Sequence, residues 1–383
     1  FGMVDMMMVG KIPGDTAAAV SAVGMTNQPM FLGLSLIQAL NVGGTAIIAR
    51  YFGAKKYNRM GSILKHVMIL AMVFCVIPTA ILMLIFAPEI LSLLGGDATV
   101  INVGVDYFRI VTIGFIFQSL SFTVTAALRG IGETKIPMKN NIIANSCNVL
   151  GNAILIYGMF GFPALGVTGA AIATAASNLI AMVLNVRYIL SGKSILKLDF
   201  KEKFEFRVEV MHDLVRIGIP TALEQMALRF GVIMFLKIVS GLGNNVYAAH
   251  QIALNVLSLS YSPAQAFGIT ASSLMGQSLG AKNEKLAERY TKMCQRIGLT
   301  LAIMSASIYF GATLLAGMYT DNVEIIQNTV IALSIVAFVQ PFQSHQLITS
   351  GALRGAGDTV WPLIAIFIGS CVIRLSVGYV FVN

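Results

Sequence analysis

The sequence has little charge. Of its 383 residues, 11% are Asp, Glu, Lys or Arg, whereas 56% are hydrophobic. A soluble globular chain usually carries about 25% charged residues, because charge covers the surface that faces water. Four long segments contain no charged residue: 69–87, 110–128, 140–186 and 298–320. The shortage of charge therefore excludes an ordinary soluble fold and indicates that lipid surrounds much of this chain.

Cysteine and histidine are also scarce, with four residues of each type. The cysteines stand singly in apolar stretches, and no pair has the spacing of a metal site. The chain lacks the glycine-rich loop of P-loop nucleotide hydrolases and the His-Glu-Xaa-Xaa-His helix of zinc proteases. No nucleophile and base stand together as an intramembrane hydrolase would need. We therefore expect that the protein is not an enzyme and that it holds no metal or organic cofactor.

The uncharged segments are long enough to cross the hydrocarbon layer as helices, which takes roughly 20 residues each. They do not alternate between polar and apolar residues as the strands of a membrane barrel do. The sequence therefore predicts an all-α integral membrane protein with one partial and ten full spans, at 1–10 (partial), 17–49, 62–87, 101–127, 137–158, 165–190, 213–240, 245–278, 295–318, 327–352 and 361–383.

The basic residues are unevenly distributed between the loops. Most of the 26 lysines and arginines fall in alternate short loops, whereas the opposite loops hold only Lys11 and Arg109 among several acidic residues. Because lysine and arginine in short loops stay on the cytoplasmic side, the basic set is predicted to be cytoplasmic in a multi-pass protein of the cytoplasmic (inner) membrane. The net charge of +9 then belongs to loops that face lipid headgroups, and we expect no nucleic-acid partner.

The longest polar stretch, residues 191–207, divides the chain nearly in half. We predict an N-terminal lobe of helices 1–6 at 1–190, a cytoplasmic linker at 191–212, and an incomplete C-terminal lobe of helices 7–11 at 213–383. The chain begins at Phe1 inside an apolar run and stops at Asn383 at the end of another. We therefore expect a fragment that lacks the start of helix 1 and a last helix.

A sequence block recurs in the two halves. Residues 128–137 (LRGIGETKIP) match 353–362 (LRGAGDTVWP) at an offset of 225, and the Gly-Ala-Lys at 53–55 recurs at 280–282 at an offset of 227. Six predicted spans lie between the longer blocks, so the halves share one orientation. Two six-helix lobes related by a pseudo-two-fold axis along the membrane normal are therefore predicted, and transporters commonly use this design.

Both blocks have the composition of a cytoplasmic helix end. A glycine permits a tight turn after one helix, and a proline suits the first turn of the next. The arginine can pair with the acid of its own block or with lipid headgroups. We therefore predict structural roles for six residues, Arg129, Gly130, Pro137, Arg354, Gly355 and Pro362.

At this point the sequence resembles the multidrug and toxic compound extrusion (MATE) transporters over essentially its full length. The matching pieces are the two blocks above, Val4-Asp-Met-Met-Met-Val-Gly10, Gly166-Val-Thr-Gly-Ala-Ala-Ile-Ala-Thr174 and Ala248-Ala-His-Gln-Ile252. The resemblance implies twelve helices in two six-helix lobes. It also implies export of organic, often cationic, small molecules such as drugs, driven by inward Na⁺ or H⁺. We expect a monomer that is surrounded by membrane lipids.

The first helix carries the best candidate for the coupling ion. Asp5 has only apolar neighbours from Phe1 to Val9, and an ionisable side chain within a span is a functional candidate. The family carries an acid here as its coupling-ion site, and desolvation favours the protonated form of a carboxylate. Asn152 and Thr174 match polar family positions on helices 5 and 6. Ile156 departs from the family's second polar position on helix 5, which removes one expected partner of Asp5.

Other residues are candidates for the substrate cavity. Gln118 lies in the middle of a span, and Met8 follows Asp5 with a flexible, polarizable side chain that suits a cavity of broad specificity. Glu224 lies on helix 7, near the position of an ion-binding glutamate in some relatives. For Asn152, Thr174 and Gln118, the alternative is a structural role in interhelical hydrogen bonds.

A second function remains open at this stage. The same superfamily contains flippases of lipid-linked saccharides, whose cavities we expect to hold several basic residues for pyrophosphate. The predicted spans hold three basic residues, Arg229, Lys237 and Arg374. So few basic residues favour an exporter of organic compounds over a flippase. Arg229 would also repel a cation, which weakens the case for Na⁺ binding in the C-terminal half.

Overall fold

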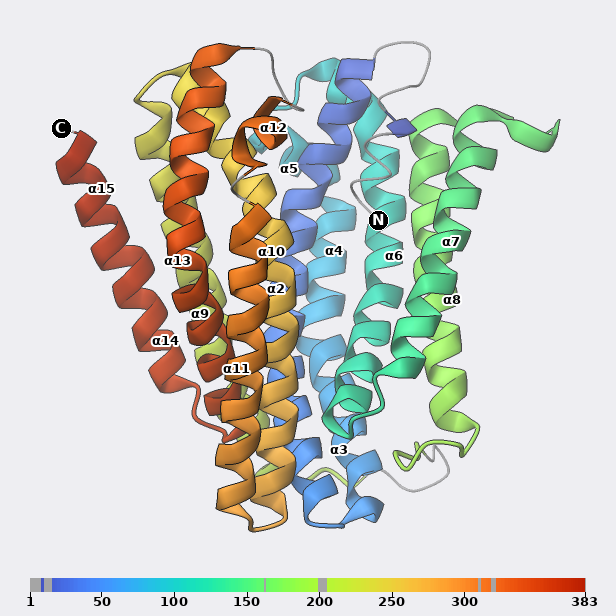
Figure 1. Cartoon of the computed structure of the whole chain (residues 1–383). Coiled ribbons are helices and arrows are strands. Elements are labelled where there is room, and N and C mark those ends of the chain that lie inside the picture. The colour runs from blue at the N-terminus through green and yellow to red at the C-terminus, as the bar shows by residue number, and fades with distance from the viewer. Residues whose placement is uncertain are drawn as a thin grey trace. The chain divides into compact units, whose positions relative to one another are not determined.

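The computed structural model describes residues 8–9, 16–161, 163–198, 205–308, 311–317 and 322–382. Every regular element in these residues is a helix (Figure 1). The first half contains α2 (Thr16–Gly53), α3 (Tyr57–Leu70), the π-helix η1 (Ala71–Val76), α4 (Ile77–Ile85), α5 (Ala87–Leu93), α6 (Ala98–Gly130), α7 (Lys135–Tyr157), the 3₁₀ helix η2 (Met159–Gly161) and α8 (Gly166–Leu190). The second half contains α9 (Val208–Ser240), α10 (Asn244–Gly280), α11 (Glu284–Ile308), α12 (Ala312–Gly317), α13 (Val323–Gly355), α14 (Val360–Ile366), the π-helix η4 (Phe367–Ile373) and α15 (Arg374–Val382).

The predicted all-α membrane fold is confirmed, and each of the ten predicted full spans overlaps a helical stretch. Six helical stretches are long and apolar enough to cross a membrane: Ala18–Gly53, Tyr57–Ile85, Ala98–Gly130, Gly166–Leu190, Val323–Gly355 and Val360–Val382. The other long helices carry more polar residues, such as the asparagines of α7 and the charges of α9. In a membrane protein such residues are expected to face the interior of the bundle rather than lipid.

The chain divides into two compact units. Unit 1 comprises Phe1–Gly44 and Tyr57–Leu214, and unit 2 comprises Thr45–Lys56 and Val215–Asn383. The helix α2 contributes its long first part to unit 1 and its last turns to unit 2. The predicted division into functional lobes joined by a linker at 191–212 stays a prediction.

Unit 1 is built around α6 and α8. These two helices pack along each other, α7 packs along α8, and the shorter α4 and α5 pack against α6. A buried apolar cluster between α2 and α6 includes Ile37, Phe108 and Phe115. Gly114 of α6 permits the close approach of α8, because a Cβ at this position would lie 2.9 Å from the Cα of Ala175. Tight packing of small residues is how helices associate in lipid, where apolar burial offers little driving force.

Unit 2 is built around α10 and α13. These helices pack along each other, and α11 packs against both, as the side-by-side ribbons of α10, α11 and α13 show in Figure 1. Gly268 and Gly351 sit at this contact, since a Cβ on Gly268 would lie 2.8 Å from the carbonyl oxygen of Leu347 and one on Gly351 would clash with the backbone of Gly268. Backbone contact through glycine therefore fixes the centre of unit 2.

The internal repeat extends to the backbone conformation. Lys55 and Lys282 occupy the same place in the Gly-Ala-Lys pair and have φ values of 58° and 55°, the two positive values among the described non-glycine residues. Gly132 and Gly357, at matching positions of the longer blocks, have φ values of 85° and 82°. A left-handed residue after a helix is a common way to end it, so the two halves end these helices with the same backbone conformation.

Candidate functional site

The polar residues predicted for helices 5 and 6 meet inside unit 1. The Asn152 amide nitrogen lies 3.5 Å from Oδ1 of Asn148, and the Asn148 amide donates to Oγ1 of Thr174 at 3.2 Å. Asn148 and Asn152 are almost fully buried. The structure therefore joins two of the predicted coupling residues, Asn152 and Thr174, through a third side chain between α7 and α8.

Asn148 was not among the predicted site residues. It stands four residues before Asn152, whereas the polar family position implied by the resemblance is Ile156, four residues after Asn152. The buried face of α7 is a stripe at helical spacing, made of Pro137, Asn140, Ala144, Asn148, Asn152 and Ile156. Side chains three and four apart share a face of a helix, so this spacing in the sequence could have identified Asn148.

The described part of helix 1 reaches the end of this stripe. The carbonyl oxygen of Met8 accepts a hydrogen bond from the Tyr157 hydroxyl at 2.9 Å. Val9 and Ile156 are both buried in one apolar cluster, against which Met8 packs. Ile156, where the family resemblance implies a polar residue, thus makes an apolar contact surface beside helix 1. Asp5 lies outside the described residues, so its predicted role stays a prediction.

The third polar candidate of unit 1 stands apart from this cluster. The side chain of Gln118 on α6 is half-buried, and no hydrogen bond joins it to Asn152 or Thr174 within the part of the chain that the structure describes. The predicted substrate role of Gln118 is therefore not supported by a contact with the other candidates, and it stays a prediction.

A second buried polar cluster lies among the same helices. The Asn140 amide donates to Oδ1 of Asn185 at 2.8 Å, and the Asn185 amide donates to Oγ of Ser121 at 2.9 Å and to Oγ1 of Thr125 at 3.4 Å. All four side chains are buried and come from α6, α7 and α8. Each amide finds partners, so this cluster ties three helices together without a charge.

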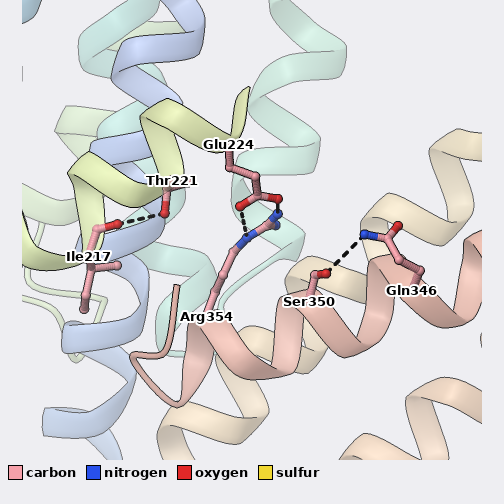
Figure 2. Close-up of polar contacts among 6 residues, drawn as sticks. All are labelled: Ile217, Thr221, Glu224, Gln346, Ser350 and Arg354. Carbon is pink, nitrogen blue, oxygen red and sulfur yellow. Dashed lines mark hydrogen bonds and ion pairs between the residues drawn. The ribbon is translucent and has the colours of Figure 1, made fainter. Parts of the chain in front are cut away.

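Unit 2 holds a buried ion pair instead. Glu224 on α9 is fully buried, and its carboxylate accepts hydrogen bonds from Nε of Arg354 at 3.3 Å and from Nη2 of the same arginine (Figure 2). Such a two-point contact is the strong geometry for arginine and carboxylate. The predicted cavity residue Glu224 is therefore neutralised by a repeat-block arginine, which changes what this carboxylate can bind.

The same contact corrects the expectation for the repeat block. Arg354 was expected to pair with the acid of its own block or with lipid headgroups, but it pairs with Glu224, 130 residues away. The acid of the block, Asp358, accepts instead from the backbone N–H of Val360, the first residue of α14, at 3.2 Å. Pro362 stands in the first turn of α14 and Pro137 in the first turn of α7, as predicted.

One histidine without a predicted role proves to have one in the fold of unit 1. His66 is fully buried on α3. Its Nε2 accepts the backbone N–H of Arg207 at 2.9 Å, so the proton belongs on Nδ1, which lies 2.7 Å from the carbonyl oxygen of Ser62. His66 therefore fastens the segment before α9 to α3. Its partner is 141 residues away, so no local pattern indicates this contact.

No group of His, Cys, Asp or Glu among the described residues could hold a metal ion. The polar interior instead consists of neutral clusters in unit 1 and a buried ion pair in unit 2. A duplicated helical membrane fold with polar groups buried inside it has the architecture of a membrane transporter.

The comparisons with known proteins identify the family. The MatE family profile matches residues 1–154 and 220–380, and the chain belongs to this family. It is 28% identical over 392 residues to the probable multidrug resistance protein NorM of Thermotoga maritima, covering 100% of this chain and 82% of that protein. It is 29% identical over 394 residues to the multidrug resistance protein NorM of Vibrio cholerae, covering 99% and 82%.

Solved structures agree on the fold. The crystal structure of MATE in the bent conformation superposes with a TM-score of 0.91 at 21% sequence identity, covering 100% of this chain and 83% of that one. The predicted two-lobe MATE fold and the family are therefore confirmed, and the chain is a multi-pass transporter of the inner membrane.

Proposed function

We propose that this protein is a secondary antiporter that exports organic, mainly cationic, small molecules in exchange for H⁺ or Na⁺. The relatives named as multidrug resistance proteins support the substrate class. No chemical change of the compound is expected, so the protein would act as a transporter without an organic cofactor. Its partners would be small organic molecules and membrane lipids, and we expect a monomer.

The observation that carries this proposal is the buried polar chain of unit 1. Asn152, Asn148 and Thr174 are linked by hydrogen bonds in the interior of unit 1, at the end of α7 where Ile156 packs with Val9 of helix 1. Polar groups at membrane depth are costly and mark ion or proton pathways. We place the coupling site here, with Asp5 of the same helix 1 as the group that binds the ion.

The charges of unit 2 favour this placement over the C-terminal half. Glu224 is the buried carboxylate of α9, and Arg354 already supplies its counter-charge. A cation would have to displace the guanidinium before it could bind there. The exposed Arg229 lies on the same helix and adds positive charge. Unit 1 therefore offers the better site for a coupling cation.

The same reasoning favours a proton over Na⁺. A hard cation needs several oxygen ligands, and Ile156 replaces one of the polar residues expected beside Asp5. A proton needs only one carboxylate, and an apolar surrounding favours the neutral form. Binding of the ion would lower the affinity for the exported compound, and the effect would be reciprocal. Flipping of lipid-linked saccharides is the second candidate, but the few basic residues of the spans do not favour it.

Transport by the full-length protein tests this proposal. In inside-out vesicles, ethidium uptake is followed under an imposed pH gradient or an imposed Na⁺ gradient, for wild type and Asp5→Asn. We expect uptake driven by an acidic lumen and abolished by Asp5→Asn. Asp213→Asn is a matched control. Asp213 is exposed near the start of α9 and is not part of the hydrogen-bonded cluster of Asn148, Asn152 and Thr174.

Other results would redirect the proposal. Uptake driven by Na⁺ alone would contradict the proton and return attention to Glu224. Normal uptake by Asp5→Asn would remove the coupling role of helix 1. No uptake of ethidium under either gradient would contradict the antiporter and make lipid-linked saccharides the next substrates to assay.

A further inference from the structure

An arginine in unit 2 stacks on an aromatic ring at membrane depth. Arg374 begins α15, within the apolar stretch Val360–Val382. Its guanidinium carbon lies 4.3 Å from the centre of the Phe235 ring on α9. A cation over the face of an aromatic ring is attracted by the negative charge above the ring. Phe235 therefore fixes where this positive charge lies.

The surrounding contacts hold the stacked pair in place. Along α9, Ala227, Gly231 and Phe235 follow one another at four-residue spacing and share one face of the helix. Cys371 donates to the carbonyl oxygen of Ala227 at 3.3 Å. A Cβ at Gly378 would lie 3.0 Å from the Phe235 ring, so the glycine makes room for that ring. The stack is thus built into the packing of α9 against η4 and α15.

The charge of Arg374 has no counter-charge in the described part of the chain. None of the ion pairs or hydrogen bonds found there includes Arg374. Glu224, the buried carboxylate of α9, already pairs with Arg354. A positive charge within a membrane span is expensive unless it is paired, and by default it marks a functional site. The arrangement therefore calls for a negative group.

A histidine beside the stack adds a further polar atom. The ring of His250 on α10 lies 5.7 Å from the ring of Phe235, centre to centre. Nε2 of His250 is buried and has no hydrogen-bond partner in the described residues. As a donor, this nitrogen can bind an anionic oxygen. Arg374 and His250 thus flank one aromatic ring from two helices.

We propose that Arg374, Phe235 and His250 form a receptor for the anionic group of an exported aromatic compound. The guanidinium would bind the carboxylate, sulfonate or phosphate in two-point fashion, Phe235 would hold the guanidinium and contact the aromatic part, and His250 would donate a further hydrogen bond. Arg374 would then favour a compound that carries an anionic group over a matched compound that lacks it. This inference rests on the proposed export function.

A lipid phosphate offers the same chemistry as a compound's carboxylate. The aromatic stack favours the compound, because a phosphate headgroup carries no ring to lie against Phe235. The two sources are separated by making nanodiscs from phosphatidylcholine alone or with phosphatidylglycerol. A lipid-occupied site would lose its preference for a carboxylate when phosphatidylglycerol is present, whereas a compound site would keep it.

Two matched dyes test the receptor. Rhodamine B carries a free carboxylate, and its ethyl ester is a cation of nearly the same shape. Export of both is measured in inside-out vesicles for wild type, Arg374→Gln and Lys237→Gln. Lys237 lies two residues from Phe235 and is exposed, so its substitution removes a charge without touching the stack. Because a hydrogen bond to a charged group is lost, we expect Arg374→Gln to reduce rhodamine B export about tenfold and to leave the ester unchanged.

One further variant and a binding measurement on wild type distinguish loss of the receptor from a folding defect. Phe235→Leu keeps the charge but removes the stack, and it should weaken rhodamine B export by a smaller factor. Equilibrium binding of both dyes to wild type in phosphatidylcholine nanodiscs needs no variant, and it should favour rhodamine B. An equal loss of both dyes in Arg374→Gln together with preferred binding of the ester by wild type would overturn the receptor.

The two proposals fail differently. If wild type exports the ester but Arg374→Gln leaves rhodamine B export unchanged, the receptor is wrong and the export function stands. If wild type exports neither dye and not ethidium, the export function itself fails. A carboxylate preference that phosphatidylglycerol abolishes would assign the site to lipid and overturn the proposed substrate class.

Discussion

The two units use different chemistry at their centres, although the same turns recur in both. Unit 1 buries neutral amides and hydroxyls: Asn148, Asn152 and Thr174 in one cluster, and Asn140, Asn185, Ser121 and Thr125 in another. Unit 2 buries a formal ion pair, Glu224 with Arg354, and also holds the half-buried Arg374, stacked on Phe235. The repeated turns therefore share a backbone conformation, while the interior of each unit has its own polarity.

The difference has a physical consequence for what each unit can bind. A neutral polar cluster can supply oxygen ligands to a cation, because no buried counter-charge must first be displaced. A buried ion pair resists a new charge, since separating the pair exposes both partners to a low dielectric. The duplicated fold can therefore assign the coupling ion to one half and groups of opposite sign to the other.

The largest effect is expected at the ion pair of unit 2. Glu224→Gln leaves the Arg354 guanidinium largely buried without its counter-charge, and breaking such a pair costs about 3–5 kcal/mol. Thermal unfolding of the purified protein in detergent measures this loss of stability. It is monitored as the decrease of the monodisperse fraction on heating. Glu209→Gln, on the exposed first turn of the same helix, is the matched control and should change little.

A double substitution sharpens this test. Replacing Glu224 and Arg354 together by leucine and methionine removes both charges, and similar replacements of buried pairs have been neutral or stabilising. We therefore expect the double variant to recover most of the stability that Glu224→Gln loses. If Glu224→Gln loses no more stability than Glu209→Gln, the ion pair does not explain the difference between the two units.

An intermediate effect is expected in the neutral interior of unit 1. Asn148→Leu removes the link between Asn152 and Thr174, and interhelical hydrogen bonds in membranes contribute about 0.6 kcal/mol each with a maximum near 1.7. We expect a loss of stability of about 1 kcal/mol, measured as for Glu224, and weaker proton coupling in the vesicle assay. Asn145→Leu on the exposed side of α7 is the control. A larger loss than in Glu224→Gln would reverse the comparison.

The sequence predicts the frame well because lipid imposes strict rules. Hydrocarbon thickness sets the length of each apolar run, and the basic loops set the orientation. The Gly-Ala-Lys segments are predicted to be a repeat, and Lys55 and Lys282 within them have matching φ values. The first end of α11 extends beyond the predicted span, because the polar turns outside the hydrocarbon also form helix.

The interior is harder to predict, because it depends on contacts between distant residues. Asn152 and Thr174 could be named from the resemblance, and Asn148 could have been found from its spacing. The pairing of Glu224 with Arg354, and that of Phe235 with Arg374, join residues more than 100 positions apart. No local pattern contains such pairs, since they arise only when α9 packs against the following helices.

The smallest effect is expected at the repeated Gly-Ala-Lys turns, where the two halves of the sequence should behave alike. Lys55 and Lys282 are exposed and hold a left-handed conformation that glycine adopts without strain. Lys55→Gly and Lys282→Gly should each stabilise the protein by up to about 1 kcal/mol, because relief of the backbone strain exceeds the greater freedom of glycine in the unfolded chain. Lys56→Gly, next to Lys55 but without a positive φ, should destabilise instead. Thermal unfolding of the three variants measures these shifts, and unequal responses of Lys55 and Lys282 would show that the repeated turns differ in energy between the two halves of the sequence.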